Sequence, residues 1–155
     1  MFEVALTVLG GLFGFVLSTA YEKAKDRRLA KQISFLLQRE LDHDIEALET
    51  LLSTSTALND PEMPKFCTAR NLKEIGQGIA ESCKREAFDA CLRDIPVLGP
   101  AALEALFAFH EQATRLPSIF DNMERFATNI RHGLFEDYIQ DLINRAQRAR
   151  GFLAV

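Results

Sequence analysis

The motif Glu40-Leu41-Asp42-His43 comes closest to a metal site in this sequence. A glutamate and a histidine three residues apart lie on one face of a helix, where both can reach one ion. Di-iron carboxylate bundles require this motif on each of two helices, together with further inward glutamates. Neither His110 nor His132 has a glutamate three residues before it. We therefore interpret His43 as a solvated side chain beside carboxylates, and expect no metal and no cofactor.

Other catalytic signatures are missing from the sequence. Cys67, Cys83 and Cys91 form no C-x-x-C pair, and their odd number favours a reducing compartment, where they serve as small buried apolar side chains. Neither phosphate-binding glycine motif occurs, since Gly76-Gln77-Gly78 alone is too short. A net charge of −4 and a pI near 5.4 argue against nucleic-acid binding. We predict no enzymatic activity and identify no small-molecule substrate.

The composition and the spacing of apolar residues favour helices throughout the chain. Glycine (8) and proline (5) are sparse in the 155 residues, and no segment alternates apolar and polar side chains for long. Apolar residues recur instead at spacings of three and four, which is typical of amphipathic helices. The sequence therefore predicts an all-α protein.

The segment from Phe2 to Tyr21 is apolar apart from Glu3. A membrane-spanning helix needs roughly 20 such residues, so we predict a transmembrane anchor over 1–21 and a helical cytoplasmic domain over 22–155. A cleaved signal peptide and a buried core helix are the alternatives. Ser18 and Ala20 could mimic a cleavage site, but no positive residue precedes the apolar run.

A basic cluster follows the apolar segment and predicts its orientation. Positive flanks remain cytoplasmic, which places the N-terminus outside and the domain inside a cell (inner) membrane crossed once. Tyr21 lies where an interfacial aromatic side chain is expected. The cluster is also predicted to contact lipid headgroups; it comprises Lys23, Lys25, Arg27, Arg28 and Lys31.

Small residues recur every four positions within the predicted span, at Gly10, Gly14 and Ser18. At this spacing two helix backbones can approach closely, so these residues could form a packing face for a second copy or another membrane subunit. Glycine is also common in membrane helices in general, so the spacing of these residues could equally have no role in packing.

The soluble part should form a helical bundle whose first helix continues from the membrane. Its charge is polarised, because residues 22–40 carry six basic and three acidic side chains, whereas 41–64 carry six acidic and none basic. Hydroxyl residues and then Pro61 and Pro64 should end this helix, and Pro100 should begin a later one. The predicted elements are a long helix over 22–52, a loop over 53–65, and helices over about 69–80, 83–94, 100–115 and 118–148.

This plan resembles that of small bacterial single-span membrane proteins of unknown function. The resemblance implies an N-terminal span followed by a helical cytoplasmic domain, and it implies no activity. It is carried by Asp26-Arg27-Arg28, Leu36-Leu37-Gln38-Arg39-Glu40-Leu41, Phe88-Asp89-Ala90-Cys91-Leu92 and Ala105-Leu106-Phe107-Ala108-Phe109-His110.

Three functional hypotheses follow. The first is a membrane-anchored helical interaction or scaffold protein, or a small accessory subunit of a membrane complex, without catalysis of its own. Its partners would be the lipid bilayer and either another protein or further copies of the chain. The second is a membrane-tethered metal-binding or enzymatic bundle that uses Glu40, His43, Asp44 and Glu46. The third is a sensor, for which the outer segment Met1–Glu3 is too short to bind much.

Overall fold

The fold of the 155-residue chain is given by a computed structural model. It describes residues 2–58, 74, 76–79, 83, 85–126 and 132–154, and within them the side chains of residues 2–16, 57–58, 122–126 and 132–134 lie outside the description. Over the described residues the chain is helical without strands, which confirms the predicted all-α class. The elements are α1 (Phe2–Leu58), α3 (Glu86–Cys91), the 3₁₀ helix η1 (Ile95–Leu98), α4 (Pro100–Ala113), α5 (Leu116–Phe126) and α6 (His132–Leu153).

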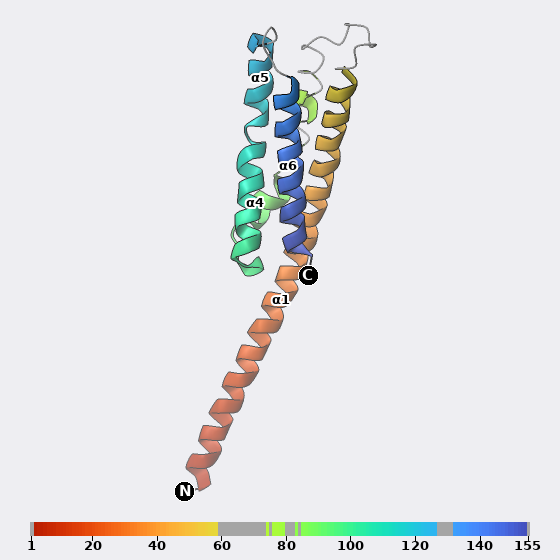
Figure 1. The fold of residues 1–155 in the computed structure, drawn as a ribbon. Coiled ribbons are helices and arrows are strands. Elements are labelled where there is room, and N and C mark those ends of the chain that lie inside the picture. Colours follow the sequence, from red (N-terminus) through yellow and green to blue (C-terminus); the bar gives the residue numbers. More distant parts are fainter. Residues whose placement is uncertain are drawn as a thin grey trace.

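Helix α1 is a single helix of 57 residues, and its N-terminal part projects from the bundle (Figure 1). At 1.5 Å per residue it is about 85 Å long. The predicted end at Leu52 is wrong, because residues 53–58 continue the helix instead of opening a loop. The hydroxyls that predicted a break bond back to the preceding turn: Thr54 Oγ1 donates to the Thr50 carbonyl (2.8 Å) and Thr56 Oγ1 to that of Leu52 (3.0 Å). Residues 59–65 of the predicted loop lie outside the description.

Helices α1 and α6 lie antiparallel along the length of the bundle (Figure 1). Ser55 Oγ donates to Glu136 Oε1 (3.4 Å) near one end, and Arg150 Nε contacts Asp42 Oδ1 (2.6 Å) near the other. The two helices also bury an apolar seam. Its fully buried members include Leu37, Leu41, Leu48 and Leu51 of α1, and Ile139, Leu142, Ala146 and Ala149 of α6.

The segment that precedes α4 is less regular than predicted. Of the helix predicted over 83–94, only residues 86–91 form an α-helix, which is α3. A turn and then η1 follow it. Pro100 does begin α4, because its missing N–H has no partner in the first turn of a helix. Gly99, just before it, has a φ of +92°, which L side chains rarely adopt.

The chain reverses between α5 and α6, so the single helix predicted over 118–148 is wrong. The ring centroids of Phe120 and Phe135 lie 5.6 Å apart. In one straight helix, these residues would be separated by about 22 Å. Both rings are buried, and they close one end of the core. Helix α6 also extends beyond its predicted end, and Leu153 in the former tail is buried.

The helix predicted over 69–80 is described only in part. Residues 74 and 76–79 are helical, and the others lie outside the description. Gly76 is buried against Phe120: a Cβ added to this glycine would lie 2.0 Å from a carbon of the Phe120 ring. Gly78, two residues later, has open space at the same position. Gly76 therefore permits a close approach between this segment and α5.

Candidate functional site

The part of α1 that leaves the bundle exposes the predicted basic cluster. Tyr21 is 74% exposed, and Lys23, Lys25, Arg27, Arg28 and Lys31 are all exposed. Among the described side chains of α1, Leu29 is the first that packs against the core. We call residues 17–28 the stalk; all of its side chains are exposed except that of Thr19, which is half-buried.

The predicted transmembrane segment largely precedes the stalk. Among the residues that the structure describes, no helix combines the length and apolar character needed to cross a membrane. The side chains of residues 2–16, Gly10 and Gly14 included, lie outside the description. Ser18, the third member of the predicted packing face, is exposed.

Inside the bundle, the carboxylate of Glu40 caps the N-terminus of α3. Its Oε2 accepts the backbone N–H of Ala87 (2.5 Å) and its Oε1 that of Phe88 (3.1 Å). These N–H groups have no partner within the first turn of a helix, so a carboxylate from α1 supplies what α3 lacks locally. The Glu40 side chain is 7% exposed. Burial raises the pKa of its carboxyl, the two N–H donors oppose this shift, and Asp89 and Glu86 add to it.

His110 of α4 lies on the other side of the same carboxylate. Its Nε2 is 3.9 Å from Glu40 Oε1, and has no hydrogen-bond partner among the described residues. The ring is 4.1 Å from that of Phe88, measured between centroids. Burial, and then the guanidinium of Arg85, lower the pKa of His110 to about 4, while Asp89 acts in the opposite direction. His110 is therefore neutral at pH 7, and packs as an aromatic side chain.

The two described cysteines are free thiols with little nucleophilic character. Burial, and then the charge of Asp44, raise the pKa of Cys83 to about 12. Burial also raises the pKa of Cys91, with smaller contributions from Asp94 and Glu40. Because the thiolate is the reactive form, both side chains are inert at neutral pH. Cys91 is buried in the core, as predicted for a small apolar side chain, whereas Cys67 lies outside the description.

The carboxylates near the Glu40-x-x-His43 motif do not converge on an ion. The His43 side chain is 55% exposed and its Nδ1 lies 3.7 Å from Asp44 Oδ1. Asp44 itself is buried. No set of three or more His, Cys, Asp or Glu side chains within the described ranges is arranged to hold a metal ion.

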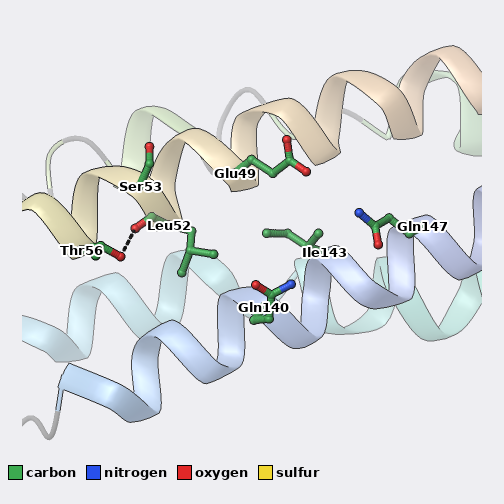
Figure 2. A pocket seen from close by; sticks show the side chains of 7 residues that line it. All are labelled: Glu49, Leu52, Ser53, Thr56, Gln140, Ile143 and Gln147. Carbon is green, nitrogen blue, oxygen red and sulfur yellow. Dashed lines mark hydrogen bonds between the residues drawn. The ribbon is translucent and has the colours of Figure 1, made fainter.

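A surface groove separates α1 and α6 at the end of the bundle away from the stalk (Figure 2). Its volume is about 610 Å³. The half-buried side chain of Leu52 provides apolar surface in it, Ile143 beneath is buried in the core, and the other lining side chains are polar. The lining residues are Glu49, Leu52, Ser53 and Thr56 of α1 and Gln140, Ile143 and Gln147 of α6.

Sequence reasoning missed the Glu40–His110 pair and the groove. Glu40 and Asp44 continue the buried positions Ile33 and Leu37 at spacings of three and four, and this phase could have predicted their burial. The groove depends on which faces of α1 and α6 meet, and neither helix contains that information alone. Comparison with protein-family models, curated proteins and solved structures finds no match for this chain.

Proposed function

We propose that this chain is a membrane-anchored interaction protein, an adaptor or small accessory subunit of a membrane complex without catalysis of its own. In this proposal residues 1–21 cross the inner membrane with the N-terminus outside, and the bundle lies in the cytoplasm. The observation that carries the proposal is the continuity of α1, which runs without a break from the apolar segment into the core. A continuous helix couples the orientation of the bundle to that of the anchor.

The dimensions of α1 suit this arrangement. Leu29 lies about 12 Å beyond Tyr21 along the helix. Between them lies most of the exposed basic cluster, at the height of the headgroups of an anionic leaflet. Each such side chain contributes on the order of 1 kcal/mol to membrane attraction. The sequence within the anchor adds a contact surface for another membrane helix, the small-residue face of Gly10, Gly14 and Ser18.

The buried polar groups of the bundle make contacts that stabilise the fold. They therefore support an interaction role without catalysis. The Glu40 carboxylate accepts two backbone N–H groups, and the neutral His110 ring packs against Phe88. Exposed apolar side chains on the bundle offer contact surface instead; they are Phe35, Leu36, Leu92, Phe107 and Phe152.

Full-length protein with a C-terminal tag, isolated from native membranes, tests the proposal. The protein should stay in the membrane fraction after high-salt and alkaline washes, and in mild detergent it should co-purify with a stoichiometric protein partner. The double variant Leu9→Arg, Phe13→Arg should move to the soluble fraction. A matched control, Phe35→Arg with Leu36→Arg, adds the same charge at exposed positions of α1 and should stay in the membrane. Release of the unaltered protein by alkaline washing would contradict the anchor.

A further inference from the structure

A hollow lies on the surface of α1 where the stalk meets the bundle. Its volume is about 370 Å³, which is within the range of sites for small ligands. All of the residues that line it belong to α1. They are Tyr21, Ala24, Lys25, Arg28, Leu29 and Gln32.

The spacing of these residues explains the hollow. Tyr21, Ala24, Lys25 and Arg28 are separated by three, four and seven positions, so they are neighbours on one face of the helix. Four side chains in this arrangement enclose a hole on the helix surface, of the kind that receives a side chain in coiled coils. Three of the four are long, whereas Ala24 contributes a single methyl group and leaves the hole open.

The charge of the hollow is positive. Lys25 and Arg28 are exposed and form no ion pair with another residue that the structure describes. Glu22 and Asp26 are close in sequence, but neither lines the hollow. The hollow therefore suits an anion with several acceptor oxygens. A second copy aligned in the same membrane would bring the same two cations against it, and like charges disfavour that occupant.

We propose that this hollow binds the headgroup of an anionic phospholipid, with Lys25 and Arg28 donating to the phosphate oxygens. The inference deepens the proposed membrane attachment and rests on it. In that arrangement Lys25 and Arg28 lie about 6 and 10 Å beyond Tyr21 along the helix. The headgroup layer on each side of a bilayer is about 5–8 Å thick. Because side chains in a helix lean towards its N-terminus, both cations reach back towards this layer.

A site of this kind differs from general attraction to a charged surface. Lys23 and Arg27 lie two residues before and after Lys25, so each is about 160° away from it around the helix. Both are exposed and neither lines the hollow. General attraction depends on the number of positive charges, so these two residues would contribute as much as Lys25 and Arg28. A headgroup held in the hollow depends on Lys25 and Arg28 alone.

Native mass spectrometry of the full-length protein in mild detergent, titrated with phosphatidylglycerol, tests this assignment. Lys25→Gln with Arg28→Gln should weaken binding of the first lipid about ten-fold, because two charge-assisted hydrogen bonds are lost. Lys23→Gln with Arg27→Gln removes the same charge and should change that affinity by less than about two-fold. All four side chains are exposed on the stalk, so neither variant alters the core of the bundle.

The shape of the hollow provides the second readout. Ala24→Leu fills the hole without changing the charge, and should weaken phosphatidylglycerol binding several-fold. Ala20→Leu makes the same change at an exposed position outside the hollow, and should leave binding unchanged. Phosphatidylcholine, which has the phosphate but no net charge, should bind more weakly, and inorganic phosphate should not displace phosphatidylglycerol.

Four results would each overturn the assignment. They are equal effects of the two charge variants, no effect of Ala24→Leu, equal affinity for phosphatidylcholine, and displacement of the lipid by inorganic phosphate. The last result would identify the hollow as a site for a free anion.

Failure of the anchor is a separate outcome. A protein that is released by alkaline washing, yet binds phosphatidylglycerol through Lys25 and Arg28, refutes the anchor and keeps the headgroup site. A membrane-retained protein in which the two charge variants act equally keeps the anchor and refutes the site.

Discussion

The carboxylate of Glu40 and the imidazole of His110 lie 3.9 Å apart, from Oε1 to Nε2, in the interior of the bundle. Glu40 comes from α1 and His110 from α4. The Phe88 ring of α3 packs against the imidazole at a tilt of 37°, and the backbone N–H of Phe88 donates to the Glu40 carboxylate. Three elements thus meet around one buried carboxyl group. Their cohesion depends on the N–H donors, because His110 is neutral at pH 7.

Substituting Glu40 tests the cap of α3. Glu40→Gln keeps one acceptor oxygen but places an amide N–H₂ against the second backbone donor, so we expect a loss of about 1–3 kcal/mol. Hydrogen exchange at the Ala87 and Phe88 amides should accelerate by about 5- to 150-fold. Glu46→Gln, at an exposed position of the same helix, is the control and should leave both amides unchanged. Equal protection in the two variants would show that the cap does not stabilise α3.

The pKa of His110 predicts acid sensitivity. Its folded value of about 4 lies below the ordinary 6.5, so the unfolded state binds the proton more tightly. Stability from this group is therefore present above pH 6.5 and is lost as the pH falls towards 4, by on the order of 3 kcal/mol. Glu40, whose pKa is raised, acts in the opposite direction, because its ionised form costs stability above that raised value.

His110→Phe isolates the histidine contribution. Phenylalanine keeps the ring packing on Phe88 and cannot be protonated. The difference in unfolding free energy between this variant and the unaltered protein should shift in favour of the variant by on the order of 3 kcal/mol between pH 7 and pH 4. Denaturant titrations at both pH values measure it. A difference that does not change with pH would contradict the burial of a neutral imidazole.

Two glycines provide a matched pair. Gly76→Ala places a methyl group 2.0 Å from a carbon of the buried Phe120 ring, and should destabilise the protein by about 1–3 kcal/mol. Gly78→Ala meets open space within a helical segment, and should be neutral or stabilising by up to about 1 kcal/mol. Thermal unfolding of both variants checks this. Similar effects at the two positions would argue against the contact with α5.

A hydroxyl couples the end of α4 to α6. The Tyr138 hydroxyl donates to the Gln112 carbonyl at 2.8 Å, so Tyr138→Phe should cost about 1 kcal/mol in unfolding free energy. Tyr21→Phe removes the same group from a side chain that is 74% exposed, and should have no measurable effect on unfolding. Loss of stability in Tyr21→Phe alone would reverse the assignment.

Local patterns predicted the helices better than their ends. The apolar period of α1 and the proline at position 100 were sufficient to place a long first helix and the start of α4. The break predicted at Ser53 was wrong, because hydroxyl side chains can bond to the carbonyls of their own helix. The reversal before α6 depends on the contact of Phe120 with Phe135, which no local pattern contains.

The candidate sites depend more on tertiary structure than the helices do. The exposure of the basic cluster follows from its sequence, and the structure agrees. Glu40 was assigned by its motif to a possible metal site, yet its partners are backbone N–H groups 47 and 48 residues away. Hydrogen-bond donors so distant along the chain have no signature in the sequence. The membrane span, its orientation and the resemblance to single-span proteins stay predictions.

The most direct test of the anchor uses the absence of tryptophan from the sequence. Phe13→Trp and Phe35→Trp each create a single fluorophore, the first within residues 1–21 and the second on α1 about 21 Å beyond Tyr21. We predict that brominated lipid acyl chains in nanodiscs quench the emission of the Phe13→Trp protein strongly and leave that of Phe35→Trp unchanged. Unquenched emission from Phe13→Trp, or equal quenching at both positions, would contradict a bundle held above the membrane by α1.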